Sequence, residues 1–323
     1  MPSRSWGSPR SPCRAASRRT ACRWDSRSSV GGDRRQRRLL PPPPSSARHH
    51  GWTRFHRWRR AEGRSAMLTA IDHLVIAVSN LEAAADDYRK LGFTVVPGGR
   101  HPGVGTHNAL IAFADTSYLE LIGFYERRED HRWWAPLQRG GGLVDFCLQT
   151  DDLAGDAAAL RRAGVDIGDP EPRDRTRPDG VTVRWRFALA RGRHRGVAPF
   201  VIADVSGRDA RVPAERSHAN GVTGIHTVTV AVDDLAPVRA WYSTILGTPG
   251  EDARRADVGG AGVRFAIGPH AFDFLAPNDG RGPLVDWIAA RGPSPYAATF
   301  RTGAGRTGQL DPGRTHGARL SFN

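Results

Sequence analysis

A histidine and a glutamate each interrupt a run of residues that is typical of a buried β-strand. His73 lies within Ile71–Val78, and Glu120 lies within Tyr118–Phe124. Because side chains alternate between the two faces of a strand, each polar group points away from its immediate apolar neighbours. An imidazole and a carboxylate both supply lone pairs, and the carboxylate offsets positive charge, so the two suit Zn²⁺, Mn²⁺, Ni²⁺ or Fe²⁺. A hydrogen-bonded pair inside a pocket that only binds ligands is the alternative.

Five further polar residues are candidates for a substrate pocket. Arg184 and Arg186 project from one face of a strand-like run, where they could clamp a carboxylate or phosphate; charges that protect an exposed edge strand are the alternative. His107 and Asn108 follow a Gly-Thr turn, where a structural role is favoured over catalysis. Cys147 has no partner at zinc-ligand spacing, and such a residue is more often a small buried hydrophobe than a nucleophile.

The elements that must position these side chains come as a repeat. Its first copy reads strand, helix and three strands, at Ile71–Val78, Leu81–Leu91, Phe93–Val96, Asn108–Phe113 and Tyr118–Phe124. The helix begins after Ser79-Asn80, a pair suited to an N-cap, and ends at Gly92. The switch from period two to helical period and back predicts one βαβββ unit.

Three more copies follow in the same order. The second is predicted at Leu143–Thr150, Leu153–Ala163, Val181–Ala190 and Ala198–Ile202, and the third at Ile225–Val232, Leu235–Leu246, Gly262–Ile267 and Ala271–Leu275. The fourth is truncated to Tyr296–Arg301 and Ala318–Phe322, without a clear helix between them. Within each pair of copies, the connection reads as a short Trp-bearing helix closed by Arg-Gly, at Trp133–Gly140 and Val285–Gly292. These matches predict an α+β fold of paired βαβββ modules that form half-closed mixed sheets, duplicated as a whole.

The positive charge of the chain is confined to its first segment. Residues 1–66 contain 17 Arg, no Lys and three acidic residues, so they carry the whole formal charge of +14. Pro41–Pro44 and the lack of an apolar period predict disorder there. A transit peptide, a nucleic-acid-binding arm and translated sequence upstream of a start at Met67 are the alternatives, and we favour the last. The neutral remainder is expected to bind no nucleic acid.

The domain organisation follows from the repeat and the composition. Pro213, Ser217 and Asn220 mark a loop-rich stretch between the two halves of the repeat. The predicted segments are a disordered tail, a first pair of modules, a linker and a second, degenerate half, at residues 1–66, 67–206, 207–222 and 223–323.

Besides the first strand, three sequence stretches distinguish this repeat from a generic βαβββ pattern. They are Gly105–Leu110, Tyr118–Ile122 and Pro178–Arg186. With the four units, they resemble the vicinal oxygen chelate superfamily and, within it, the bacterial glyoxalase-like domain proteins, over roughly residues 68–323. The resemblance implies a pocket on the concave face of each paired module. It also implies a divalent metal held by residues of the first and last strands of a module.

By this resemblance, His73 and Glu120 occupy the first- and last-strand ligand positions of the first module. His73 precedes the start of its helix, Leu81, by eight residues. Counting back in the same way from Leu153 places Asp145 at the first-strand position of the second module, as a third ligand or a general base. No carboxylate follows in the last strand of that module before Asp204, so a fourth ligand is missing or displaced. The corresponding places in the second half hold Thr227, Asp273 and Ala297. We expect that half to lack a metal site.

The implied function is that of a metal-dependent lyase, isomerase or dioxygenase acting on a small oxygenated substrate, with a divalent metal ion (Zn, Mn, Ni or Fe) as the cofactor. The metal would act as a Lewis acid on two adjacent substrate oxygens. A metal-free protein of the same fold that binds or sequesters a small molecule is the alternative. No apolar run approaches the roughly 18 residues of a membrane span, and no secretory leader is visible, so we expect a cytoplasmic monomer or homodimer without membrane contact.

Overall fold

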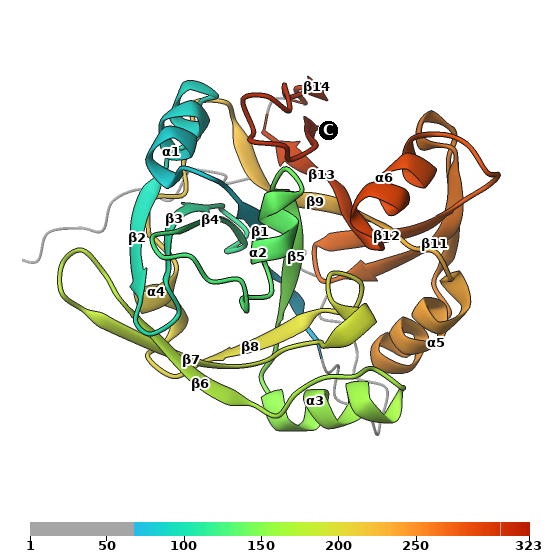
Figure 1. The fold of residues 1–323 in the computed structure, drawn as a ribbon, viewed down its shortest axis with the longest axis horizontal. Coiled ribbons are helices and arrows are strands. Elements are labelled where there is room, and N and C mark those ends of the chain that lie inside the picture. Colours follow the sequence, from blue (N-terminus) through green and yellow to red (C-terminus); the bar gives the residue numbers. More distant parts are fainter. Residues whose placement is uncertain (1–67, 304) are drawn as a thin grey trace, which may run out of the picture. The chain divides into compact units, whose positions relative to one another are not determined.

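The structure is a computed structural model that describes residues 68–303 and 305–323 (Figure 1). They belong to one compact unit. The predictions made for residues 1–66 lie outside the described residues. No helix among the described residues is both long and apolar enough to cross a membrane.

The first two repeats close into one eight-stranded barrel. The first repeat forms β1 (Ala70–Ala77), α1 (Leu81–Lys90), β2 (Val96–His101), β3 (Thr106–Ala112) and β4 (Tyr118–Phe124). The second, after α2 (Trp134–Gln138), forms β5 (Gly142–Gln149), α3 (Leu153–Arg162), β6 (Glu171–Thr176), β7 (Thr182–Ala188), the 3-10 turn η1 (Gly192–His194) and β8 (Phe200–Asp204). The strand order around the barrel is β1-β4-β3-β2-β6-β7-β8-β5. The predicted pairing of two βαβββ modules is confirmed.

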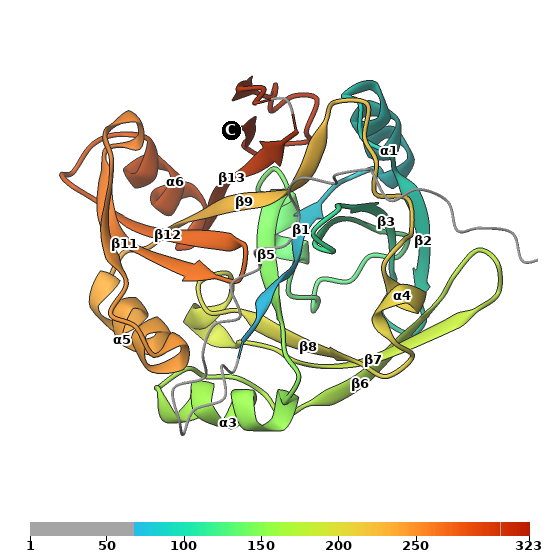
Figure 2. The ribbon, with the colours of Figure 1, turned by 180° about the vertical axis from the view of Figure 1, so that it is seen from behind.

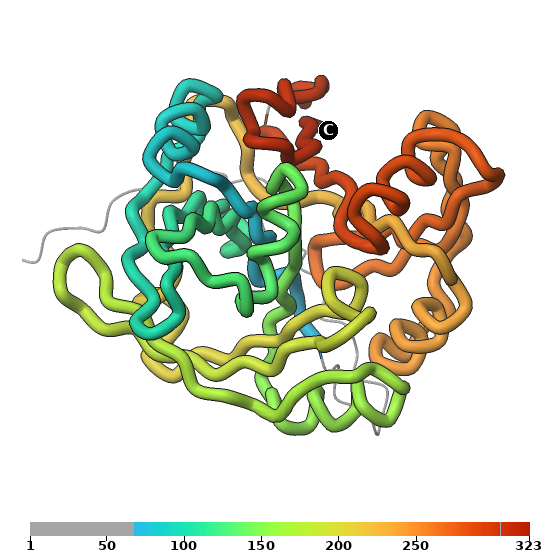
Figure 3. Tube along the Cα trace, in the orientation of Figure 1, coloured from blue at the N-terminus to red at the C-terminus, as the bar shows by residue number. Residues whose placement is uncertain are grey.

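The second half forms an open, seven-stranded sheet. It consists of β9 (Val222–Ala231), α5 (Leu235–Leu246), β10 (Glu251–Arg255), η2 (Ala256–Val258), β11 (Gly260–Ile267), β12 (His270–Pro277), α6 (Pro283–Arg291), β13 (Ser294–Thr302), β14 (Gly308–Gln309) and β15 (Leu320–Phe322). Its strand order is β10-β11-β12-β9-β13-β15-β14. The chain completes the barrel, blue to yellow in Figure 3, before it enters this sheet, orange to red. The fourth repeat is truncated as predicted, with no helix among its described residues.

Side-chain caps explain why the predicted helices begin where they do. Each of the first three repeats starts its helix at a residue whose side chain accepts a backbone N–H: Asn80 for α1, Asp152 for α3 and Asp234 for α5. The sequence missed β6 and β10, which consist largely of charged residues without an apolar period, and it placed β2 too early, at Phe93–Val96. These strands form because a neighbouring strand pairs with them.

One irregularity in β1 matters for the site. The pairing of β1 with β5 passes from Ile71–Leu148 directly to His73–Cys147, so Asp72 is an extra residue on β1. Such a β-bulge re-aims side chains that would otherwise alternate strictly. Adjacent residues normally point to opposite faces of a strand, yet Asp72 and His73 are hydrogen-bonded to each other through their side chains.

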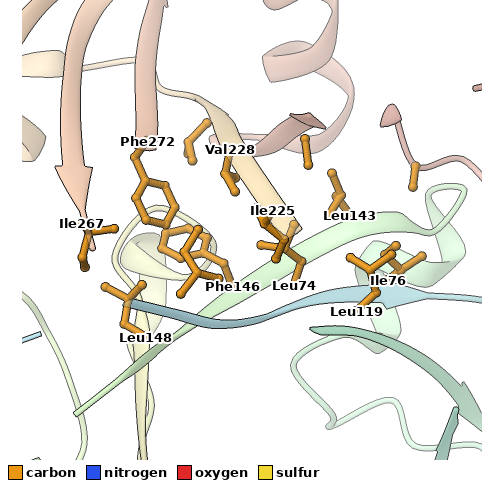
Figure 4. Close-up of a cluster of buried hydrophobic side chains, with 14 of the residues drawn as sticks. Leu74, Ile76, Leu119, Leu143, Phe146, Leu148, Ile225, Val228, Ile267 and Phe272 are labelled. Carbon is orange, nitrogen blue, oxygen red and sulfur yellow. The ribbon is translucent and has the colours of Figure 1, made fainter. Parts of the chain in front are cut away.

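The outer face of β1 and β5 is buried against the second sheet. Figure 4 shows Leu74 and Phe146 from the barrel meeting Ile225 and Phe272 from the sheet. The rings of Phe146 and Phe272 lie 4.9 Å apart. Because these apolar side chains take the outer face, the alternate positions of β1 point into the barrel, where His73 lies.

The connection between the halves is attached to the first module. After β8 the chain forms the short helix α4 (Arg208–Arg211) and then runs past β2 toward α1 before β9 begins (Figure 2). His218 accepts the Thr94 N–H at 3.0 Å through Nδ1 and donates through Nε2 to the Ala112 carbonyl at 3.0 Å. The residues predicted to link the halves are therefore also hydrogen-bonded to the first module of the barrel.

Candidate functional site

The barrel encloses a cavity of about 490 Å³. His73 from β1 and Glu120 from β4 both line it, together with Asn108 from β3. Trp185 and Phe200 supply apolar walls from the second module. A cavity with apolar walls and a few convergent polar groups has the form of a small-molecule site.

The His73 ring has one nitrogen free. Its Nδ1 donates to Oδ1 of Asp72 at 2.7 Å, so Nε2 is the ring nitrogen that faces the cavity. Nε2 lies 3.5 Å from Oε2 of Glu120. Tyr118 stacks on the ring with centroids 4.6 Å apart. The chain thus holds the second nitrogen of an imidazole beside a carboxylate oxygen.

Asp72 is fully buried and held by arginines from the connection between the halves. Arg211 binds both of its oxygens, at 2.9 and 2.7 Å, and Arg208 binds one of them. Burial alone would raise the pKa of Asp72, but Arg211, the His73 hydrogen bond and Arg208 together hold it well below its usual value of 3.8. Asp72 is therefore a carboxylate at neutral pH, and it keeps the proton of His73 on Nδ1.

Glu120 is positioned by a second chain of hydrogen bonds. Asn108 donates from Nδ2 to its Oε1 at 2.7 Å, and Arg175 donates to Oδ1 of Asn108 at 3.2 Å. These bonds leave Oε2 of Glu120 beside His73. Nε2 of His101 lies 4.0 Å from Oε1, and burial, partly opposed by Glu120, lowers the pKa of His101 to about 4. His101 is therefore a neutral imidazole near this carboxylate.

The His73–Glu120 pair fits a divalent metal. Two ligands at about 2.1 Å from a tetrahedral ion lie about 3.4 Å apart, close to the 3.5 Å between Nε2 and Oε2. Metal-binding histidines also characteristically donate their other N–H to a carboxylate, as His73 does to Asp72. An imidazole and a carboxylate suit Zn²⁺, Mn²⁺, Ni²⁺ and Fe²⁺ alike.

A second group of ligand-type atoms lies close by but is less suitable. Asp72, His73 and Cys147 bring three such atoms within 4.8 Å of one another. Both oxygens of Asp72 are already bound by arginine. Burial raises the pKa of Cys147 well above its usual value, so the residue is a thiol and not a thiolate. The His73–Glu120 side of the imidazole is the better position for an ion.

Asp145, predicted as a third ligand or general base, does not line this cavity. Its Oδ2 accepts from Nε1 of Trp133 at 2.9 Å and lies 2.7 Å from Arg132. Its Oδ1 accepts from the backbone N–H of Phe146 at 3.0 Å. The carboxylate thus holds Arg132 and Trp133, which both line the cavity.

The structure brings one of the five predicted pocket residues into the cavity. Asn108 lines it, whereas His107, the next residue of β3, lies on the other face against Tyr125. Cys147 is buried opposite His73 but is not part of the cavity wall. Arg184 and Arg186 are exposed on the outer face of β7. The inner face of β7 carries Trp185 and Phe187 instead.

Several residues of the site were missed. Tyr118 shares a face of β4 with Glu120, so strand periodicity could have found it. Arg175 lies in a run that reads as exposed, and Arg208 and Arg211 lie in a stretch that reads as a linker, so no local signal marks them. Their burial depends on contacts with residues that are distant in the sequence.

Comparison with known proteins agrees with the geometry. A family model described as a glyoxalase-like domain matches residues 71–246, more than half of the chain. A hypothetical protein from Staphylococcus aureus is 14% identical, with a TM-score of 0.59 over 80% of this chain and 99% of that one. A triple mutant of 4-hydroxymandelate synthase from Streptomyces coelicolor is 17% identical, with a TM-score of 0.51 over 73% of this chain and 71% of that one. These two likenesses show a shared fold.

No curated protein matches the chain. The family model and the paired βαβββ barrel agree on one assignment. The chain belongs to the glyoxalase-like domain family of the vicinal oxygen chelate superfamily.

Proposed function

We propose that the barrel is the active site of a metal-dependent enzyme, a lyase, isomerase or dioxygenase, that acts on a small oxygenated molecule. The observation that carries the proposal is the pair formed by Nε2 of His73 and Oε2 of Glu120, 3.5 Å apart at the cavity wall. Each is oriented by its own buried partners, Asp72 for the histidine and Asn108 for the glutamate. Ligands oriented in this way lose little conformational entropy when they bind an ion.

The residues of the chain have distinct roles in this proposal. A bound divalent metal would supply Lewis acidity to two adjacent oxygens of the substrate. Asp72 keeps His73 in the tautomer whose Nε2 lone pair faces the cavity. Asn108 holds one oxygen of Glu120 and leaves the other free. Trp185 and Phe200 exclude water from the apolar end of the substrate.

A metal-free binding protein is the second candidate. The observation that favours it is the small number of candidate metal ligands. Asp145, predicted as a third ligand, is bound by Arg132 and Trp133 instead. In that case, His73 and Glu120 would act as hydrogen-bonding groups toward a small molecule in the cavity. The aromatic walls suit a flat or apolar ligand under either proposal.

Metal content separates the two candidates. The full chain, purified without chelator and incubated with Zn²⁺, Mn²⁺, Ni²⁺ or Fe²⁺, is expected to retain one of these ions stoichiometrically by elemental analysis. His73→Ala should lose it. His107→Ala is the matched control, because it removes a histidine on the outer side of the same barrel and should keep the metal. Protein that stays metal-free with all four ions would leave only the binding-protein candidate.

A further inference from the structure

A second cavity, of about 430 Å³, lies outside the barrel interior. Residues in and around α2, at the start of β5 and around η1 meet the beginning of α5 and the end of α6 there. Trp241 and Pro237 of α5 give it an apolar wall. Its volume is in the range of small-molecule sites, and the proposed metal site gives it no role.

The charge of this second cavity is unbalanced. Five arginines and three aspartates line it, a net charge of +2. Arg132 and Asp145 pair with each other, and the remaining aspartates accept backbone N–H groups at the start of α5. Among the described residues, no carboxylate pairs with the other arginines, which are Arg139, Arg193, Arg195 and Arg291. Guanidinium groups bind phosphate and carboxylate oxygens with paired N–H donors.

A buried histidine points to the same ligand chemistry. His194 is 8% exposed and lines the second cavity. Its Nδ1 accepts the Asp166 N–H at 2.8 Å, so the ring proton belongs on Nε2. That nitrogen is buried and has no hydrogen-bond partner among the described residues. Burial and the nearby Arg193 lower the pKa of His194, so the ring is a neutral donor that lacks an acceptor.

We propose that the second cavity binds a small molecule with at least two negative charges on oxygen, as a phosphate ester carries. The four arginines without a carboxylate partner would neutralise the anion, and the imidazole of His194 would lie beside it in the cavity wall. The uncharged body of the ligand would pack on Trp241, whose ring lies 4.6 Å from that of His194. A ligand with a single carboxylate would neutralise only half of the net charge of +2 in this cavity.

The two cavities share a wall. Arg132 and Trp133 line both, and both bind Oδ2 of Asp145, at 2.7 and 2.9 Å. An anion bound by the other four arginines would also attract Arg132, weaken its pairing with Asp145 and so alter the wall of the barrel cavity. Ligands in the two cavities are therefore coupled, and the coupling acts equally in both directions.

Pyrophosphate is a simple probe for this site. Isothermal titration of the full chain with pyrophosphate is expected to show saturable binding. In the double variant R139A/R193A, whose arginines line the second cavity but not the barrel cavity, the affinity should fall at least tenfold. Both residues are exposed and outside helices and strands, apart from the 3-10 turn, so the fold should survive. Arg184→Ala is the matched control, because Arg184 is an exposed arginine that lines neither cavity.

The outcomes separate this site from the others on the chain. Binding that is lost in R139A/R193A but kept in Arg184→Ala and in His73→Ala supports the second cavity and is independent of the metal proposal. Binding that persists undiminished in R139A/R193A overturns it and assigns the anion to other arginines, such as those of residues 1–66. Absence of saturable binding to the wild-type chain also overturns it.

Discussion

The barrel and the second sheet place a carboxylate at equivalent points of the repeat and use it differently. In the barrel, Glu120 on β4 stands opposite Leu110 of β3, and its only close donor from that strand is an amide. In the second sheet, Asp273 on β12 stands opposite Arg264 of β11. Arg264 binds both oxygens of Asp273, at 2.6 and 2.8 Å. One carboxylate keeps an oxygen free, and the other does not.

The partner strand shows the same contrast. β1 offers His73 beside Glu120, whereas β9 offers Thr227, whose hydroxyl contacts the neighbouring His226 at 3.1 Å. A buried acid is thus present in both halves, but at these two equivalent strand positions the barrel places an imidazole beside it and the second sheet places a threonine. A buried carboxylate is therefore not enough to form the proposed site. The site also requires that oxygens of the carboxylate are not already bound by a neighbouring side chain.

The largest expected effect compares the two buried aspartates. Asp72→Asn leaves Arg208 and Arg211 to share Asp204 in a buried position, and breaking such a pair costs about 3–5 kcal/mol. Asp273→Asn should cost about 1 kcal/mol, because the side chain of Arg264 is 44% exposed and can be hydrated. Urea unfolding of both variants measures the two values. Equal losses would show that the halves do not differ in this way.

The next effect is the pH dependence that Asp72 adds. Its pKa in the folded chain lies well below 3.8, so the unfolded chain takes up a proton first as the pH falls. The stabilisation by Asp72 is complete above about pH 4 and is lost as the pH falls through the folded pKa. Unfolding free energies from pH 6 to pH 3 should therefore decline more steeply for wild type than for Asp72→Asn. Parallel profiles would contradict the assignment of a charged Asp72.

Much of the fold could be predicted, because its signals are local. The caps at Asn80, Asp152 and Asp234 and the alternation in the buried strands place most helices and strands. The strands β6 and β10 escaped because their residues carry no apolar period, and pairing with a neighbour decides them. Local periodicity reports burial well only where one face of an element is apolar.

The site was predictable only in part, for a related reason. His73 and Glu120 interrupt apolar strands and are therefore conspicuous. The bulge that turns Asp72 toward His73 leaves no mark in the sequence, and Arg211 reaches Asp72 across 139 residues. Strand alternation separates the face of Arg184 from that of Trp185, but it does not say which face is inward. The closure of the barrel decides that.

A smaller effect tests how Glu120 is positioned. Asn108→Ala removes the donor to Oε1 and should weaken metal binding about 10–100-fold, as is usual for partners that orient a metal ligand. Competition with a chromophoric chelator measures the change. His107→Ala, one residue along β3 on the opposite face, should leave the affinity unchanged. An equal loss in both variants would indicate a general disturbance of β3 and not a role for the amide.

The smallest change in stability is expected at the residues that pair with His73 in the barrel and with Thr227 in the second sheet. Cys147 stands opposite His73, and Thr299 stands opposite Thr227. The hydroxyl oxygen of Thr299 is buried without a hydrogen-bond partner among the described residues. Thr299→Val keeps the shape and removes that group, so the free energy of unfolding should rise by up to about 1 kcal/mol. Cys147→Val removes no unpaired oxygen and adds a methyl group at a fully buried position, so it should give no gain. If Thr299→Val instead destabilised the chain in urea, the hydroxyl would have a hydrogen-bond partner in the folded chain.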